Sequence, residues 1–306
     1  MDTAVSGCSV YSVSDRRVLH LISVLRAHLW CCSGRDSFRL LIYTFPDRMA
    51  DQKLAKLLAT IEEAGALLLS LWPGRTGAAH DNLGVTSKAD GTLVSEADMR
   101  SNQLILGAIR ELFPDDAILS EEVAPDVEAL RHAKRTWVVD PLDGTSSFLH
   151  GRDDFSILVA LAEHHTPTIG IMRFPARNLL VLGLRGAGAT CNGAPLRVSS
   201  HARARQGCVY IRNFEANRSE LACPMMDSGL ALLKVASGEL DGAIIRMTTH
   251  REWDLAAPMA VLLEAGGRVT DQTGVEIRCG TGILDFSYCI ASNGLIHQEL
   301  QDLIPA

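Results

Sequence analysis

The sequence lacks the features that mark a nucleic-acid-binding, membrane-spanning or secreted protein. Its formal net charge is −7, so no basic excess favours nucleic acid or an anionic membrane as a partner. No apolar run is long enough to cross a bilayer. A secretory signal is not evident either, because the apolar stretches near the start are interrupted by arginines at positions 16, 17, 26, 35 and 39. We therefore expect no nucleic acid and no membrane as partner.

The cysteines form neither a CxxC pair nor any regular spacing. The chain has eight of them, dispersed over both halves. Such a scatter favours reduced thiols over a disulfide scaffold or a zinc site. The sequence thus predicts a cytoplasmic protein.

The chain is long enough for one large domain or two closely joined ones. Residues 1–48 show no sustained helical or strand periodicity, so we expect a poorly ordered N-terminal extension, with Met49 as the favoured start. An organellar presequence is the alternative. The folded domain is predicted at 49–306, with an α+β first half over about 49–185 and an α/β second half over about 186–306.

Apolar periodicity outlines the elements of this domain. It predicts a helix from about residue 51 that ends near Pro73, and a second helix that opens at Ser95 and stops before Pro114. Short apolar runs predict strands at 137–139, 155–162, 168–174, 179–184, 242–245, 269 and 288–291. Later segments predict helices at 230–236, at 254–265 and at the end of the chain. This order indicates layered helices and sheets rather than a uniform βαβ repeat.

The most informative segment runs from Trp137 to Thr145, with the sequence Trp-Val-Val-Asp-Pro-Leu-Asp-Gly-Thr. A buried strand delivers Asp140 to its end, Pro141 is expected to block the strand there, and Gly144 permits a tight turn. Asp140 and Asp143 can then converge on one point, where two buried carboxylates would repel each other. A divalent cation removes that repulsion, and hard oxygen ligands favour magnesium.

Other interpretations of this segment stay open. Asp-Gly-Thr is also a common surface turn after a strand, and Asp143 could be only a helix cap. Phosphatases with an aspartyl nucleophile also carry Asp-Gly-Thr after an apolar strand, but a single residue separates their two acids. Here two residues separate Asp140 from Asp143, a spacing that favours metal ligation over a covalent phosphoaspartate.

Three motifs in order resemble the inositol monophosphatase-like family of lithium-sensitive, magnesium-dependent phosphatases. They are Ile-Leu-Ser-Glu-Glu at 118–122, Asp-Pro-Leu-Asp-Gly-Thr-Ser-Ser-Phe-Leu-His-Gly at 140–151, and Trp-Asp-Leu-Ala-Ala through Glu-Ala-Gly-Gly at 253–267. The resemblance covers residue 51 to the end. It implies an α/β fold of alternating helix and sheet layers (an αβαβα sandwich, as in inositol monophosphatase and fructose bisphosphatase) and a phosphoric monoester hydrolase that acts on a small phosphorylated metabolite. A homodimer is common in this family.

The resemblance also implies roles for single residues. Glu121, Asp140 and the carbonyl of Leu142 would hold the Mg²⁺ ion that activates water, and Asp140, Asp143 and Asp254 would hold a second ion near the leaving oxygen. Two such metals clamp both ends of an in-line displacement.

The remaining implied roles concern water and phosphate. Thr145 and Asp98 would polarise the attacking water, and the N–H groups of Gly144 and Thr145 would cradle the phosphate. Asp98 lies three residues after Ser95, which is also the spacing of a helix-capping box. Asp254 could likewise be a helix cap.

The substrate is predicted less directly. Inositol-hydrolysing members have a glutamate seven residues before the last metal aspartate, where this chain has Met247. Ser120 and the segment 151–155 resemble the bisphosphate nucleotidase branch, which hydrolyses 3′-phosphoadenosine 5′-phosphate. Arg246 or Arg251 could then meet the second phosphate. The alternatives are an inositol-1-monophosphatase, a histidinol-phosphate phosphatase and, in another class, a non-catalytic sensor of a phosphorylated ligand.

Overall fold

The computed structural model describes residues 48–74, 86–87, 93–214 and 219–304. Contacts divide the chain into two units, Met1–Ala55 and Lys56–Ala306. Of the first, the structure describes only the start of helix α2 (Arg48–Leu71), so nearly all of the predicted extension at 1–48 lies outside the described residues. The fold that follows is that of the second unit.

A seven-stranded sheet forms the centre of this unit. Its strands run in the order β3 (Ala117–Ser120), β4 (Arg135–Asp143), β5 (Ser156–Glu163), β6 (Thr166–Phe174), β7 (Leu179–Leu184), β8 (Gly188–Cys191) and β9 (Ala194–Pro195). Strands β3 and β4 are parallel, and all other neighbours are antiparallel. From β5 to β9 short hairpins join successive strands, whereas helical segments lie between β3 and β4 and between β4 and β5. The two-residue strands β1 (Thr86–Ser87) and β2 (Leu93–Val94) pair separately.

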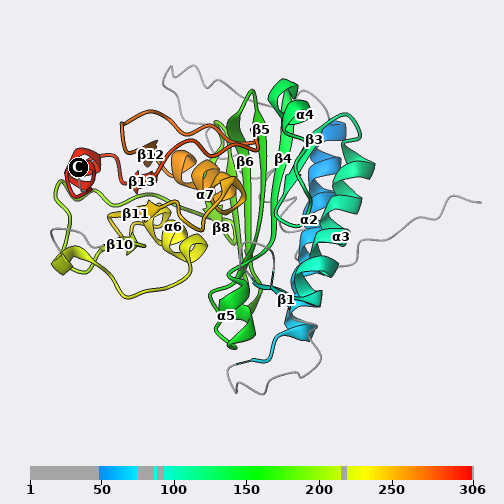
Figure 1. Ribbon diagram of the computed structural model, residues 1–306, viewed down its shortest axis with the longest axis horizontal. Coiled ribbons are helices and arrows are strands. Elements are labelled where there is room, and N and C mark those ends of the chain that lie inside the picture. The colour runs from blue at the N-terminus through cyan, green and yellow to red at the C-terminus, as the bar shows by residue number, and fades with distance from the viewer. Residues whose placement is uncertain (1–47, 75–85, 88–92, 215–218, 305–306) are drawn as a thin grey trace, which may run out of the picture. The chain divides into compact units, whose positions relative to one another are not determined.

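Helices cover both faces of the sheet (Figure 1). Helix α3 (Glu96–Leu112) packs on β4, and Gly65 of α2 lies against the side chain of Arg173 in β6. On the other face, α7 (Glu252–Glu264) packs across β4 to β8. Gly183 lets this helix approach closely, because a Cβ there would lie 2.6 Å from the Cα of Val261. The short helices α4 (Val127–His132) and α5 (Thr145–Leu149) flank β4 in sequence.

A second sheet lies beyond α7 and α6 (Ser228–Ala236). Its order is β10 (Val209–Arg212), β11 (Gly242–Arg246), β13 (Tyr288–Ser292) and β12 (Arg268–Asp271), with β10 parallel to β11. Helix α8 (His297–Gln301) packs on β13 and β11. The layers therefore alternate between helix and sheet, as the sequence predicted.

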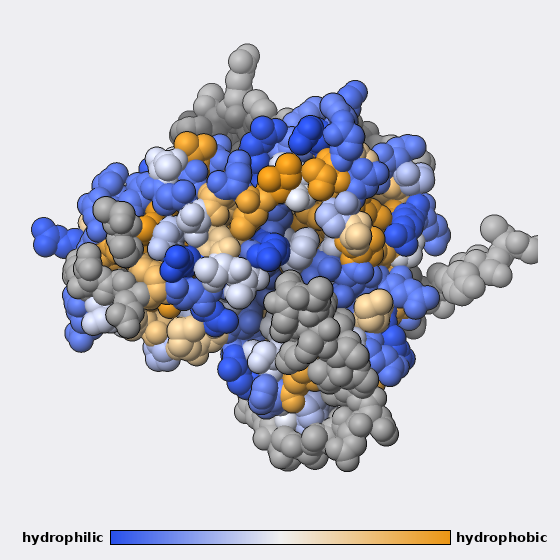
Figure 2. All heavy atoms as spheres, viewed as in Figure 1, coloured by the Kyte–Doolittle hydropathy of each residue, from blue (hydrophilic) through white to orange (hydrophobic). Residues whose placement is uncertain are grey.

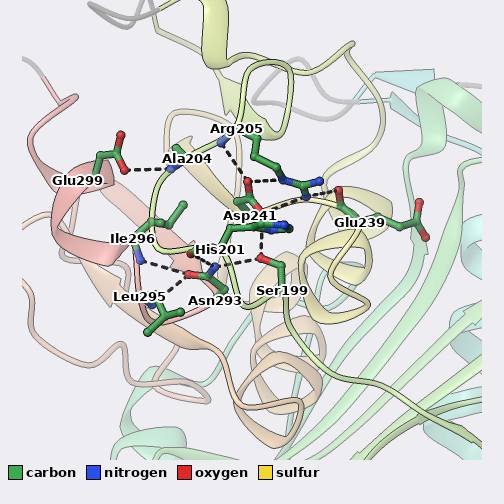
Figure 3. Close-up of polar contacts among 10 residues, drawn as sticks. All are labelled: Ser199, His201, Ala204, Arg205, Glu239, Asp241, Asn293, Leu295, Ile296 and Glu299. Carbon is green, nitrogen blue, oxygen red and sulfur yellow. Dashed lines mark hydrogen bonds and ion pairs between the residues drawn. The ribbon is translucent and has the colours of Figure 1, made fainter.

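Asp241 ties the connection between the two sheets to β11 (Figure 3). Its fully buried carboxylate accepts hydrogen bonds from Ser199 Oγ at 2.8 Å and from the Arg205 backbone N–H at 3.0 Å, and it lies 3.0 Å from His201 Nδ1. A buried carboxylate is stable only with such partners. The segment between β9 and β10 is thereby fixed although it holds no regular element.

The predicted end of the central strand was wrong. Strand β4 continues through Pro141 to Asp143, with a shift in its register against β5 between Asp140 and Asp143. A proline has no N–H to give to the ladder, and an irregularity of this kind is one of the places where a sheet tolerates it.

The surface offers no sign of a membrane span. None of the described helices is long and apolar enough to cross a bilayer. On the face shown in Figure 2, hydrophilic and hydrophobic residues are interleaved, as on most folded proteins.

Candidate active site

Strand β4 carries two acids into the protein interior at its C-terminal end. Asp140 is 1% exposed and Asp143 is 5% exposed. The Oδ1 atom of Asp140 accepts the Leu142 N–H at 3.0 Å, and Oδ2 of Asp143 accepts the Ser156 hydroxyl at 3.1 Å. The irregular end of the strand therefore holds both carboxylates through local bonds.

Helix α7 brings the third acid. Asp254 lies in the first turn of this helix, three residues after its N-cap Arg251, and accepts the backbone N–H of Arg251. Its carboxylate thus satisfies a free donor of the helix start, although it is not the N-cap itself. Asp140, Asp143 and Asp254 each place one oxygen within 4.8 Å of the others.

Burial and mutual repulsion disturb the ionisation of these three acids. Burial raises the pKa of Asp140, and the charges of Glu121, Asp143 and Asp254 raise it further. Burial also raises the pKa of Asp143, helped by Asp227, and raises that of Asp254 to about 7. Over the ranges that the structure describes, no Lys, Arg or His forms an ion pair with any of the three. Three hard oxygen donors without a protein cation suit a divalent metal ion.

Glu121 stands directly after β3, the strand parallel to β4. Its backbone N–H donates to the Val139 carbonyl at 3.1 Å, which fixes its position relative to β4. The Glu121 charge contributes to raising the pKa of both Asp140 and Asp254, so this carboxylate lies beside the cluster. Three of the four predicted metal carboxylates, those of Asp140, Asp143 and Asp254, thus come from two distant segments and gather in one place, whereas Glu121 lies near them but outside the 4.8 Å group.

Thr145 and Asp98 meet next to this cluster. Thr145 Oγ1 lies 2.9 Å from Asp98 Oδ1 and 3.2 Å from the Leu142 carbonyl. Asp98 is fully buried, and its Oδ2 accepts both the N–H and the hydroxyl of Ser95, at 2.8 and 2.6 Å. Burial raises the pKa of Asp98, although its hydrogen bonds oppose that shift. Asp98 thus holds the helix start with one oxygen and Thr145 with the other.

Gly144 makes the turn between β4 and α5. Its φ of 80° lies in the left-handed region that favours glycine. A Cβ at this position would lie 2.9 Å from Asp227 Oδ2, so the side chain of any other residue would collide with that carboxylate. The turn directs the free N–H groups of the start of α5 toward the same end of β4.

The two arginines that the sequence suggested for a second phosphate differ in their surroundings. Arg246 is exposed and stacks over the Tyr288 ring, whereas Arg251 is half-buried beside Asp254.

Sequence reasoning did not predict that Asp227 lies against the turn at Gly144. This residue precedes an apolar helical segment, where the sequence alone indicates a helix cap.

Comparison with known proteins identifies the family of the chain. A model of the inositol monophosphatase family matches residues 50–305. The chain therefore belongs to the inositol monophosphatase family, whose members are Mg²⁺-dependent hydrolases of phosphate monoesters. The match confirms the predicted family, the enzyme class and magnesium as the cofactor.

Relatives with different named substrates match at similar levels. A fructose-1,6-bisphosphatase/inositol-1-monophosphatase of Thermotoga maritima is 30% identical over 80% of this chain and 92% of its own length. A histidinol-phosphatase of Chlorobaculum parvum is 32% identical over 82% of this chain and 95% of its own. The 3′(2′),5′-bisphosphate nucleotidase CysQ of Shigella flexneri is 31% identical over 62% of this chain and 80% of its own. All three names refer to phosphorylated substrates, but the compound that carries the phosphate differs among them.

The fold is also that of solved structures. The structure of a Thermotoga maritima IMPase superimposes with a TM-score of 0.69, at 28% identity, over 82% of this chain and 96% of that one. This similarity confirms the predicted layered α/β architecture.

Proposed function

We propose that this chain hydrolyses a small phosphate monoester at the end of β4, with Mg²⁺ held by Glu121, Asp140, Asp143, Asp254 and the Leu142 carbonyl. One observation carries the proposal: three carboxylates from β4 and α7 converge to within 4.8 Å of one another, and among the described residues no Lys, Arg or His forms an ion pair with them. Mg²⁺ bound there supplies positive charge to the phosphoryl oxygens and makes water a better nucleophile.

Thr145 and Asp98 orient that water in this proposal. The Thr145 hydroxyl donates to Asp98, so its oxygen lone pairs are left to accept a hydrogen bond from water. Asp98 is buried, and the resulting rise of its pKa makes its carboxylate a stronger base than an exposed aspartate. Together the two residues can hold water in one orientation and draw its proton away from the phosphorus.

The start of α5 receives the phosphate. The backbone N–H groups of Gly144 and Thr145 precede the first intrahelical hydrogen bond, and such groups favour anions. These donors follow Asp143 directly in the chain, so they lie at the same end of β4 as the acidic cluster.

For the rest of the substrate we favour a 3′(2′),5′-bisphosphate nucleotide such as 3′-phosphoadenosine 5′-phosphate. Arg251 supports this choice, because it is half-buried and directly follows His250, whose carbonyl its Nη1 contacts at 3.0 Å. A guanidinium held there can meet a second phosphate. Met247 is 7% exposed, and an apolar side chain offers nothing to the hydroxyl groups of inositol.

A substrate panel tests this function. Purified protein is given the adenosine bisphosphate, inositol phosphate, histidinol phosphate and fructose bisphosphate, each with Mg²⁺ or EDTA, and released phosphate is measured. We expect Mg²⁺-dependent release that is fastest with the bisphosphate nucleotide and that is inhibited by lithium. Asp140→Asn should abolish it, whereas the exposed Asp115→Asn should not. Binding of these compounds without release of phosphate would favour a sensor instead.

The preference for the second phosphate depends on Arg251. Arg251→Ala should raise KM for the bisphosphate nucleotide at least tenfold and leave KM for histidinol phosphate nearly unchanged, and Arg246→Ala should change neither. Equal effects on both substrates would argue against a role in substrate choice. A homodimer and a cytoplasmic location remain predictions.

A further inference from the structure

Arg212 is the last residue of β10, and it takes no part in the proposed chemistry. Strands β10 and β11 are parallel, and Arg212 pairs with Ile245, one residue before the end of β11. From β11 the chain runs through Arg251 to Asp254 in α7. Open α/β sheets bind their ligands outside the carboxyl ends of parallel strands. Arg212 therefore lies at the edge of the second sheet that leads to the acidic site.

Hydrogen bonds connect Arg212 to the start of α6. Its Nη1 lies 3.4 Å from the hydroxyl oxygen of the buried Tyr210, and that hydroxyl donates to the Met226 carbonyl at 3.0 Å. Met226 precedes Asp227, whose Oδ2 lies 2.9 Å from the point at which a Cβ on Gly144 would stand. The guanidinium of Arg212 is therefore held on the side of α6 that meets the turn proposed to receive the reacting phosphate.

His250 and Arg251 contact the same helix start. His250 is 6% exposed, and its Nε2 lies 3.2 Å from Ser228 Oγ in the first turn of α6. Arg251 Nη1 donates to the His250 carbonyl at 3.0 Å. Burial and, after it, the charges of Arg212 and Arg251 lower the pKa of His250 to about 4. Both guanidinium groups therefore lie near this one ring.

Neither arginine is paired with an acid within the described ranges. Arg212 and Arg251 are both half-buried, yet no described carboxylate forms an ion pair with either guanidinium group. By contrast, the guanidinium of Arg173 is paired with Glu62 at 3.0 Å. Like charges near each other in a partly dehydrated place repel, and a bound anion removes that repulsion. The surroundings of the two arginines therefore favour an anionic group of a ligand.

We infer that Arg212 and Arg251 together bind the second, non-reacting phosphate of the substrate, which makes Arg212 a further residue that determines substrate choice. The inference rests on the proposed function. Guanidinium groups are always charged and offer two parallel N–H groups to phosphate oxygens, and one phosphate has enough oxygens for both. The competing explanation is that Arg212 serves only the fold, through Tyr210 and through the nearby charge of Asp227.

Two substrates that differ only in the second phosphate separate the two explanations. 3′-Phosphoadenosine 5′-phosphate and adenosine 3′-phosphate share the nucleoside and the phosphate that is released. A structural defect lowers kcat/KM for both alike, whereas a lost contact to the second phosphate lowers it for the bisphosphate alone. The matched control is Arg185, an exposed arginine in the turn between β7 and β8.

The test is phosphate release with Mg²⁺, read as the ratio of kcat/KM for the bisphosphate to kcat/KM for the monophosphate. Arg212→Ala should lower this ratio about 10- to 100-fold, the usual loss of a hydrogen bond to a charged group, and Arg251→Ala should lower it by a similar factor. The double variant should lose less than the product of the two factors, because both groups contact one phosphate. Arg185→Ala should leave the ratio unchanged. Circular dichroism verifies that each variant is folded, and Arg212→Gln replaces Arg212→Ala if that one is not.

Three results would overturn the inference: a wild-type ratio near one, an unchanged ratio in Arg212→Ala, and a double variant that loses the full product of the two single factors. The first would mean that no second phosphate is bound, the second that Arg212 serves only the fold, and the third that the two arginines do not share one phosphate. If wild-type protein hydrolyses neither nucleotide nor any other phosphate monoester, the proposed function fails instead. Calorimetric binding of the two nucleotides under the same conditions then measures the same ratio, so the two failures are distinguishable.

Discussion

Thr145 Oγ1 lies 2.9 Å from Asp98 Oδ1, across 47 residues of chain. The Leu142 carbonyl is 3.2 Å from the same hydroxyl. A hydroxyl has one proton, so it donates fully to only one of these oxygens. The shorter bond to Asp98 leaves the Leu142 carbonyl available as the metal ligand that we propose.

The Thr145 hydroxyl should be required for turnover. Thr145→Ala should lower kcat at saturating Mg²⁺ by about 100-fold or more, a typical loss for a group in proton transfer. Thr145→Ser keeps the hydroxyl bonded to Asp98 and should stay within about tenfold of wild type. Steady-state release of phosphate measures both. A kcat for Thr145→Ala within threefold of wild type would contradict the role.

Removing one charge of the cluster should stabilise the metal-free protein. Asp140→Asn keeps the oxygen that accepts the Leu142 N–H and removes a buried carboxylate that faces three others. In EDTA at pH 8 its melting temperature should exceed that of wild type by a few degrees, since 1 kcal/mol shifts a domain of this size by about 2–4 °C. In Mg²⁺ the order should reverse. A lower melting temperature in EDTA would mean that the acids do not repel one another.

The pH dependence of stability should report Asp254. Its pKa rises from 3.8 to about 7 on folding, so its contribution to the stability of the metal-free protein falls as pH increases from 3.8 to about 7, by up to about 1.4 kcal/mol per pH unit, and is constant above that. The buried His250 and His297, each with a pKa of about 4, act in the opposite direction below pH 6.5.

The contribution of Asp254 is therefore isolated as the difference in melting temperature between wild type and Asp254→Asn. In EDTA, the melting temperature of wild type minus that of Asp254→Asn should fall steadily between pH 5 and 7. Saturating Mg²⁺ should remove the fall, because the cation binds the ionised carboxylate. A difference that is constant with pH in EDTA would count against the raised pKa.

Gly170 tests the packing that places α7 over the sheet, and Gly107 in α3 serves as a comparison at an open position. A Cβ on Gly170 of β6 would overlap the Ala257 carbonyl and lie 2.8 Å from the Ala260 Cβ. Gly170→Ala should therefore destabilise the protein by about 1–3 kcal/mol. Gly107, in the middle of α3, has open space where a Cβ would stand, so Gly107→Ala should stabilise by about 0.5–1 kcal/mol. Urea denaturation measures both, and a harmless Gly170→Ala would refute the close approach.

Most helices and strands could be predicted from the sequence because their apolar periodicity is local. The strand at Leu179–Leu184 and the helix that begins after Ser95 agree with their predicted positions. The path of β4 through Pro141 could not be predicted, because whether a proline ends a strand depends on the register of its neighbour β5. The strand order of the second sheet could not be predicted either, because β13 pairs with both β11 and β12 across long stretches of chain.

The candidate site, too, could be predicted only in part from the sequence. The sequence by itself determined which carboxylates the protein has and which motifs they belong to, because a motif is a run of neighbouring residues. Only the tertiary structure decided that Asp254 approaches Asp140 and Asp143, and that Asp227 lies against the turn at Gly144. In sequence Asp227 is no more than a helix cap. Its second contact exists because α6 starts against the turn at Gly144, and packing between distant segments sets that distance.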